Sequence, residues 1–335
     1  MINDKIISKT IKEHKYRKDI DGLRAIAVLA VIGFHAFPEW IKGGFIGVDI
    51  FFVISGFLIS SIIFTELDNN KFNFMTFYSR RIRRIFPSLI IVLLAFYSLG
   101  WFTLLADEFQ QLGKHILSGA GFISNFTLLR EANYFDNTTD TKPLLHLWSL
   151  GIEEQFYIIW PFLLWVAWKK RFNKLLVCSS IIILSFLINI ITIKIDPKIS
   201  FYSPVSRFWE LISGSMLAYI SINKKISPAN GNKFLLNTTS TLGIFLIIIS
   251  ISLITKENNF PGWLAIFPII GTYLLISVDS NTFINRVILS NRTLVWIGLI
   301  SYPLYLWHWP LLAFSRTISG VITSRHSLPC GQTLL

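Results

Sequence analysis

Cysteine is nearly absent from this sequence, whose 335 residues include only Cys178 and Cys330. Two cysteines cannot build a disulfide framework, and no spacing of cysteine and histidine fits a metal site, so we expect no bound metal. Acidic residues are also few, with 19 Asp and Glu against 31 Lys and Arg and a net charge of +12. Because the basic residues cluster between apolar segments, this excess reports membrane topology, and we exclude nucleic acid as a partner. No polar stretch is long enough to form a separate soluble domain.

Long apolar segments dominate the chain instead. Hydrophobic residues make up 53% of the sequence, and the mean hydropathy is +0.56. Apolar runs of about 20 residues recur, which is the length that a helix needs to cross a bilayer. We therefore predict an all-α, polytopic transmembrane helical bundle of about nine to ten spans. The predicted spans are 20–40, 44–66, 85–105, 145–168, 175–193, 208–222, 234–254, 262–278 and 294–315, and the Gly- and Ser-rich stretch 115–130 is expected to be re-entrant or interfacial.

The distribution of positive charge predicts the orientation of these spans. With a cytoplasmic amino terminus and a non-spanning 115–130 stretch, most Lys and Arg residues lie on the inner side, as the positive-inside rule expects. The first apolar segment follows a basic leader without a cleavage site, so we expect it to stay as an anchor. We divide the chain into a basic cytoplasmic leader (1–19), a transmembrane domain (20–315) and an atypical polar tail (316–335).

Arg24 and His35 lie together in an otherwise apolar stretch, where ionisable side chains are costly and commonly functional. Eleven residues at about 100° each make three turns plus roughly 20°, so both side chains share one helix face, about 16 Å apart along its axis. We expect both to be functional. The alternatives are that Arg24 reaches a lipid headgroup and that His35 is a hydrogen-bonded packing residue.

A run of four arginines precedes the third predicted span. Arginine binds phosphate through bidentate hydrogen bonds, so the run could hold a phosphorylated cytoplasmic donor. Anionic lipid is an equally good ligand for such a cluster. The run consists of Arg80, Arg81, Arg83 and Arg84.

Carboxylates near other predicted spans are further candidates. Asp49 needs a partner, for which His35 or Lys42 is close in sequence, and a structural ion pair is slightly favoured over a catalytic role. Glu153 and Glu154 lie at a span entrance, and at most one is expected to face a common site because adjacent helical residues point about 100° apart. Either could orient an imidazole or bind sugar hydroxyls. The residues assigned to substrate binding are Trp148, Tyr157, the helically spaced pair Arg207 and Glu210, and His308, whose aromatic neighbours equally suit an interfacial belt.

These segments, in this order, resemble the acyltransferase 3 family of bacterial multi-span membrane acyltransferases. The matching pieces are Tyr16–Arg24 with His35, Gly43–Leu58, Arg80–Pro87, Leu147–Pro161 and Ser301–Pro310. The resemblance implies transfer of an acyl group, commonly acetyl from acetyl-coenzyme A, to a carbohydrate hydroxyl across the bacterial cytoplasmic (inner) membrane. It also implies that Arg24 and His35 are the residues associated with activity. No permanently bound cofactor is expected, because the acyl-CoA is a substrate.

From this resemblance we expect the arginine run and Arg24 to hold the coenzyme A. His35 is then a general base or a transient acyl carrier, and Arg24 is a candidate for stabilising the oxyanion. The expected partners are acyl-CoA, membrane lipids and a surface or lipid-linked glycan such as lipopolysaccharide O-antigen, with capsule and peptidoglycan as other acceptors. The short polar sequence after Ser319 differs from members that continue with a further span and an SGNH-type domain, which suggests truncation. A proton-coupled transporter or permease, and an inactive truncated acyltransferase, are the alternative functions.

Overall fold

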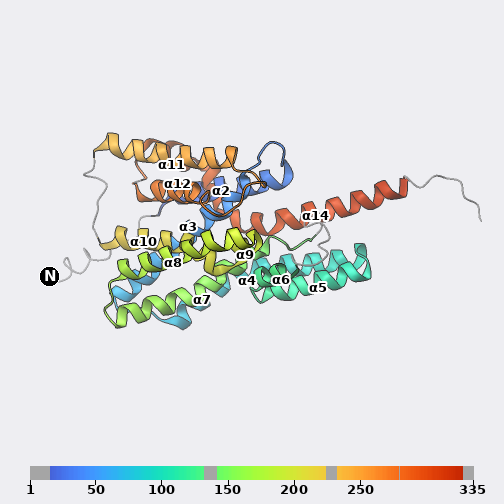
Figure 1. Cartoon of the computed structure of the whole chain (residues 1–335), viewed down its shortest axis with the longest axis horizontal. Coiled ribbons are helices and arrows are strands. Elements are labelled where there is room, and N and C mark those ends of the chain that lie inside the picture. The colour runs from blue at the N-terminus through green and yellow to red at the C-terminus, as the bar shows by residue number, and fades with distance from the viewer. Residues whose placement is uncertain (1–15, 132–141, 224–231, 279, 327–335) are drawn as a thin grey trace, which may run out of the picture.

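The computed structural model describes residues 16–131, 142–223, 232–278 and 280–326, with side chains up to residue 317. Within these ranges the chain forms helices and no strands, as predicted (Figure 1). The first half contains α2 (Lys18–Ala36), the short η1 (Gly44–Ile46), α3 (Gly47–Asp68), α4 (Phe74–Thr103), α5 (Ala106–Ala120), α6 (Ser124–Glu131) and α7 (Leu147–Lys169). The second half contains α8 (Lys174–Ile195), α9 (Pro197–Tyr202), α10 (Pro204–Asn223), α11 (Lys233–Leu253), α12 (Ile266–Ser277), η4 (Ile284–Leu289), α13 (Arg292–Leu299) and α14 (Ser301–His326).

Four of the described helical segments are long and apolar enough to cross a membrane: Gly44–Asp68, Phe74–Thr103, Lys174–Ile195 and Lys233–Leu253. The chain is therefore a membrane protein. The predicted non-spanning stretch 115–130 contains the end of α5 and most of α6, and neither helix is among these four. The total number of spans and their orientation stay predictions. Residues 1–15 of the predicted leader and 327–335 of the predicted tail lie outside the described residues, and α14 continues as a helix through His326.

Helix starts are marked by asparagine and aspartate side chains. Each accepts a hydrogen bond from a backbone N–H in the first turn, which satisfies a donor that the helix itself leaves free. Such caps begin α4, α8, α9, α11 and α13. The capping residues are Asn73, Asn173, Asp196, Asn232 and Asn291.

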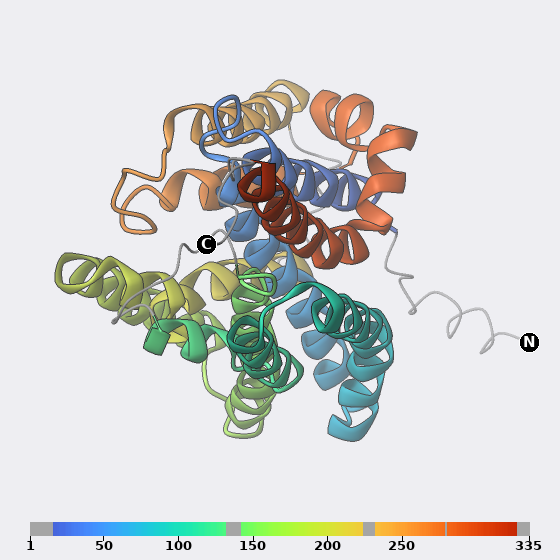
Figure 2. The same ribbon diagram turned by 90° about the vertical axis from the view of Figure 1, so that its right-hand side faces the viewer.

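The centre of the bundle is the contact between α3 and α10, where two glycines allow the backbones to touch. A Cβ atom added at Gly56 would lie 1.7 Å from the carbonyl oxygen of Leu211, and one at Gly214 would lie 2.0 Å from that of Val53. Small residues at helix crossings are the usual means of close packing in membranes. Helix α2 also packs against α3, and α14 packs against both α2 and α4, as the view along the bundle shows (Figure 2).

The start of α2 is anchored by a buried carboxylate. Asp19 accepts hydrogen bonds from Arg17, at 2.6 Å, and from Asn285 of η4, at 2.9 Å. The guanidinium of Arg17 also donates to the carbonyl oxygens of Ile276 and Val278 at the end of α12. These bonds hold in place the helix that carries both Arg24 and His35.

Candidate active site

Two cavities lie on either side of a shared wall. The first, which we name the arginine cavity, is lined by Arg24, Arg81 and Arg84 together with Glu153 and Glu154. The second, which we name the histidine cavity, has a volume of about 420 Å³ and is lined by His35 and His146 among many aromatic residues. Val48 and Tyr305 line both cavities.

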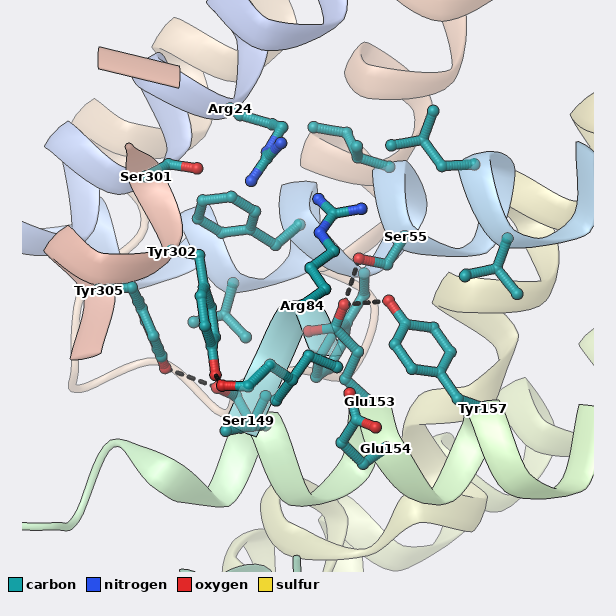
Figure 3. Close-up of a pocket in the computed structure, with 18 of the residues that line it drawn as sticks. Arg24, Ser55, Arg84, Ser149, Glu153, Glu154, Tyr157, Ser301, Tyr302 and Tyr305 are labelled. Atoms are coloured by element: carbon teal, nitrogen blue, oxygen red, sulfur yellow. Dashed lines mark hydrogen bonds between the residues drawn. The ribbon is translucent and has the colours of Figure 1, made fainter. Parts of the chain in front are cut away.

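The arginine cavity gathers its charged groups from three helices. Arg24 comes from α2, Arg81 and Arg84 from the start of α4, and the glutamates from α7, and Figure 3 shows Arg24 and Arg84 directed into the same space. Asp21, one turn before Arg24 on α2, lies 3.7 Å from its guanidinium. The guanidinium of Arg81 lies 5.4 Å from the centre of the Tyr157 ring. Three arginines that line one cavity can bind an anionic ligand such as phosphate.

Glu153 and Glu154 both line the arginine cavity, but their carboxyl groups point in different directions, that of Glu153 toward Ser55 and Tyr157 and that of Glu154 away from them (Figure 3). Glu153 accepts short hydrogen bonds from the hydroxyls of Ser55 and Tyr157 (Figure 3). Glu154 Oε1 is buried and has no hydrogen-bond partner among the described residues. Two adjacent positions can border one cavity because this cavity extends along α7 from Ser149 to Tyr157.

The arginine run divides between the cavity and the surface. Arg81 and Arg84 line the cavity, whereas Arg80 makes a 2.6 Å ion pair with Glu66 and Arg83 lines neither cavity. The helical period explains the position of Arg83, which lies about 160° from Arg81 around α4. Arg80 lies only about 40° from Arg84 around the helix, and its ion pair with Glu66 directs it elsewhere.

At the histidine cavity, the imidazole of His35 is in direct contact with a second imidazole, that of His308, which does not line the cavity itself. His35 Nδ1 of α2 lies 3.1 Å from His308 Nε2 of α14, although the residues are 273 positions apart. His308 Nδ1 in turn lies 2.6 Å from the carbonyl oxygen of Tyr305. The indole of Trp309 packs edge-on against the His35 ring, and Arg316 donates to the His35 carbonyl oxygen at 2.6 Å.

Tyr305 forms the wall between the cavities and ties α14 to α7. Its hydroxyl donates to the carbonyl oxygen of His146 at 3.0 Å and lies 2.5 Å from the hydroxyl of Ser149 (Figure 3). Its backbone carbonyl contacts His308, so a single residue touches both cavities and the imidazole pair. A group passing from one cavity to the other would pass Tyr305 and Val48.

A buried ionic cluster lies beside the histidine cavity. The guanidinium of Arg207 lies 3.1 Å from Asp49 and 2.9 Å from Glu210, and all three side chains are buried. The predicted pairing of Arg207 with Glu210 is confirmed. The predicted partner of Asp49 is wrong, because α10 crosses α3 closely enough to supply Arg207 in place of His35 or Lys42.

A second charged cluster borders the histidine cavity from α5 and α6, outside the predicted spans. Burial favours a raised pKa for Glu131, but hydrogen bonds from Lys114, His115 and Lys142 prevail and lower its pKa to about 2. Burial lowers the pKa of His115, which the hydrogen bond to Glu131 opposes. Lys142 lines the cavity, and its carbonyl oxygen accepts a hydrogen bond from the indole of Trp309. The cluster therefore connects α5 and α6 to the cavity wall.

The predicted site residues thus separate into three groups. Arg24, Arg81, Arg84, Glu153, Glu154 and Tyr157 line the arginine cavity, and His35, Asp49, Trp148 and Arg207 line the histidine cavity. Arg80, Arg83, Glu210 and His308 are not among the lining residues of either cavity.

Sequence reasoning missed several residues of the site. Tyr305 lies three residues before His308 in a segment that drew attention for its aromatic residues, but nothing in the sequence marked it as a partition. His146 and Ser149 lie in the same segment as Glu153, whereas Val48 gave no signal at all. The roles of Tyr305, His146 and Ser149 depend on contacts between α14 and the start of α7, more than 150 residues apart.

Comparisons with known proteins extend over most of the chain. A family model described as an acyltransferase domain matches residues 17–329. The chain is 33% identical over 317 residues to the peptidoglycan O-acetyltransferase OatA of Listeria monocytogenes, which covers 91% of this chain and 50% of the relative. It is 34% identical over 317 residues to a putative O-acetyltransferase of Staphylococcus aureus, with coverages of 90% and 52%.

A third relative, the putative peptidoglycan O-acetyltransferase YrhL of Bacillus subtilis, is 33% identical over 323 residues, with coverages of 92% and 51%. The chain therefore spans about half the length of the curated relatives it matches. No solved structure gives a significant match.

Proposed function

The chain belongs to the acyltransferase family that this model describes, and from that membership we propose that it is an O-acetyltransferase. The observation that carries the proposal is the pair of cavities that share Val48 and Tyr305. Arg24 and His35 lie on the same helix, but one lines the arginine cavity and the other the histidine cavity. A donor and an acceptor that approach from opposite sides of a membrane need such an arrangement.

The donor in this proposal is cytoplasmic acetyl-coenzyme A, which occupies the arginine cavity. Its phosphates fit the guanidinium groups of Arg81 and Arg84 at the start of α4, with Arg24 deeper in the same cavity. Arg80 and Arg83 have no role in donor binding in this scheme. The flexible arm of the donor then extends toward Val48 and Tyr305, where its thioester meets the acceptor.

The acceptor is a carbohydrate hydroxyl in the histidine cavity, whose aromatic lining suits the faces of sugar rings. The names of two relatives specify peptidoglycan, so we propose a peptidoglycan acceptor. The lipopolysaccharide O-antigen expected from the sequence receives no support from these names.

We further propose a multi-pass arrangement of about nine to ten spans in the bacterial cytoplasmic membrane, with the amino terminus in the cytoplasm. Lys174 lies 3.5 Å from Asp68, so the connections α3–α4 and α7–α8 lie at one end of the bundle. The basic residues 80–84 and 169–174 are near these connections, and positive charge favours the cytoplasmic side.

In the proposed reaction, His35 removes the proton from the acceptor hydroxyl while the hydroxyl oxygen attacks the thioester carbonyl carbon. The C–O bond forms, the C–S bond breaks, and the proton passes from His35 to the departing sulfur. Arg24 lies in the other cavity, about 16 Å from His35 along α2, so in this scheme it holds the donor and does not contact the carbonyl oxygen. A transient acyl group on His35 would divide the same transfer into two steps.

The test is transfer of radiolabelled acetyl from acetyl-coenzyme A to soluble peptidoglycan fragments by the purified chain in vesicles. We expect His35→Ala to abolish transfer. Arg84→Gln should raise KM for acetyl-coenzyme A by about 10- to 100-fold, since a hydrogen bond to a charged group contributes roughly 1.5–3 kcal/mol. Arg83→Gln, one position away on the same helix, is the matched control and should leave KM unchanged.

Two results would contradict the proposal. If His35→Ala transfers acetyl at the wild-type rate, His35 is not the base. If the Arg83 and Arg84 variants have equal KM values for acetyl-coenzyme A, the arginine cavity is not the donor site. Proton-coupled uptake of a solute into sealed vesicles, with no dependence on acetyl-coenzyme A, would instead support the transporter alternative. Labelling of lipopolysaccharide but not of peptidoglycan fragments would overturn the proposed acceptor alone.

A further inference from the structure

The contact between His35 and His308 determines which ring nitrogen of each imidazole carries a proton. The carbonyl oxygen of Tyr305 can only accept a hydrogen bond, so His308 Nδ1, 2.6 Å away, must donate. A neutral imidazole that is protonated on Nδ1 has its lone pair on Nε2. His308 Nε2 is therefore the acceptor in the 3.1 Å contact, and His35 Nδ1 must be the donor.

From this geometry we propose that His308 is a positioning residue that holds His35 in the Nδ1–H tautomer and leaves the lone pair of His35 Nε2 available as the base. The inference rests on the proposed function, because it specifies how the proposed base is prepared. An imidazole oriented by a third group is a recurring arrangement in acyl transfer. Here the orienting group is a second imidazole anchored to a backbone carbonyl.

The surroundings of the pair favour the neutral state that this scheme needs. Neither imidazole forms an ion pair with a carboxylate in the described part of the chain. The charged side chains that contact His35 or the adjacent Phe34 are cationic, with Arg316 bonded to the His35 carbonyl and Lys256 placed over the Phe34 ring, whereas Asp49 of the same cavity is paired with Arg207. The His146 ring lies 5.6 Å from that of His308. A permanent positive charge on either imidazole would have no counter-charge.

His308 acts through His35 and not on the substrate. It is buried and is not among the residues that line either cavity, whereas His35 lines the histidine cavity. The sequence predicted that His308 binds substrate. In this scheme it instead positions His35, the base. When His35 gains the acceptor proton on Nε2, its Nδ1–H bond to His308 becomes charge-assisted and stronger, which stabilises the ion formed during transfer.

The tautomer can be measured without any assay of activity. In the chain labelled with ¹⁵N-histidine, the nitrogen chemical shifts distinguish protonated from unprotonated ring nitrogens, and the His35 signals are those lost in His35→Ala. We expect a protonated Nδ1 and an unprotonated Nε2. A protonated Nε2 on neutral His35 would overturn the inference, whatever the activity of the protein.

Two substitutions at His308 separate positioning from packing. His308→Gln offers an amide oxygen where Nε2 was, so it should keep both the tautomer and most of the transfer rate. His308→Leu keeps the bulk but not the acceptor, and kcat should fall by about 10- to 100-fold with both KM values unchanged. His115→Leu replaces a buried histidine that lines neither cavity and does not contact His35, so it controls for the loss of a buried imidazole, and its kcat should fall less than that of His308→Leu.

The outcomes distinguish this inference from the proposed function. If the Nδ1–H tautomer is found but the wild-type chain transfers no acetyl, the proposed function fails and the tautomer assignment stands. If the tautomer is found but neither His35→Ala nor His308→Leu slows transfer, His35 is not the base. If His35→Ala abolishes transfer but the Gln and Leu variants of His308 have equal kcat values, the function stands and the positioning role is wrong. Folding of each variant is checked by burial of the Cys178 thiol, which is fully buried in the native chain.

Discussion

Replacing Arg207 by methionine tests the buried ionic cluster between α3 and α10. The arginine lies 3.1 Å from Asp49 and 2.9 Å from Glu210, and its side chain has 0% exposure. The ring centres of four aromatic residues surround the guanidinium at 5.4–5.8 Å. Methionine fills similar space without charge, so it leaves two carboxyl groups buried with no cation between them.

The expected loss is about 3–5 kcal/mol of folding free energy, which is typical when one partner of a buried ion pair is removed. Arg80→Met provides the comparison, because Arg80 forms a shorter ion pair of 2.6 Å with Glu66 but its side chain is 53% exposed. Solvent screens such a pair, and its loss should change stability by less than about 1 kcal/mol. Distance alone predicts the opposite order, so the comparison isolates the effect of burial.

The buried thiol of Cys178 on α8 provides the assay. In a Cys330→Ser background it is the only cysteine of the chain, and it reacts with a thiol dye only when the structure around it opens. Since about 1.4 kcal/mol is a factor of ten, Arg207→Met should speed labelling by roughly two to three and a half orders of magnitude. Arg80→Met should change the rate by less than about tenfold.

Equal labelling rates for the two methionine variants would refute the reasoning. A second comparison sharpens the test, because adding Asp49→Asn and Glu210→Gln to Arg207→Met removes both carboxyl groups that are left without a cation. This triple variant should recover much of the lost stability. If it is no more stable than Arg207→Met, the loss comes from packing against the aromatic rings and not from charge.

Two further substitutions test the helix crossing and the outer cluster. Gly56→Ala should strongly destabilise the chain because its Cβ would lie 1.7 Å from the Leu211 carbonyl oxygen. Gly113→Ala is the control, because no atom lies within 4 Å of the added Cβ. Thermal unfolding in detergent measures both variants, and equal melting temperatures would contradict the close α3–α10 crossing. Glu131 has a pKa lowered from 4.5 to about 2, so the ionised carboxylate stabilises the folded state. The stability advantage of wild type over Glu131→Gln should be complete above about pH 4.5 and vanish as the pH falls through 2; an advantage independent of pH would contradict this.

The helical class and the importance of α2 followed from the sequence. Apolar runs of membrane-spanning length can form little other than helices, because the bilayer offers no partner for free backbone groups. The period of the helix placed Arg24 and His35 on one face, and each lines a cavity. The same period explains why Arg83 lies away from Arg81 on α4, but it could not separate Arg80 from Arg84, because the ion pair between Arg80 and Glu66 depends on the packing of α3 against α4.

The pairings within the site could not be predicted in this way. Asp49 pairs with Arg207, and His35 with His308, across 158 and 273 positions of the chain. Neighbours in sequence, such as Lys42 for Asp49, were reasonable candidates, but the α3–α10 crossing brings a different charge into the core. Local spacing carries no information about which distant helix will pack against a given face.

By itself, the sequence determined that this chain is a helical membrane protein, and it marked the residues too polar to lie in an apolar helix without a reason. The tertiary structure decided which of them are in contact, placed Tyr305 and Val48 between two cavities, and brought His308 into contact with His35. The physical reason is that hydropathy and helical period are properties of a single segment, whereas a cavity and an ion pair exist only where several segments pack together.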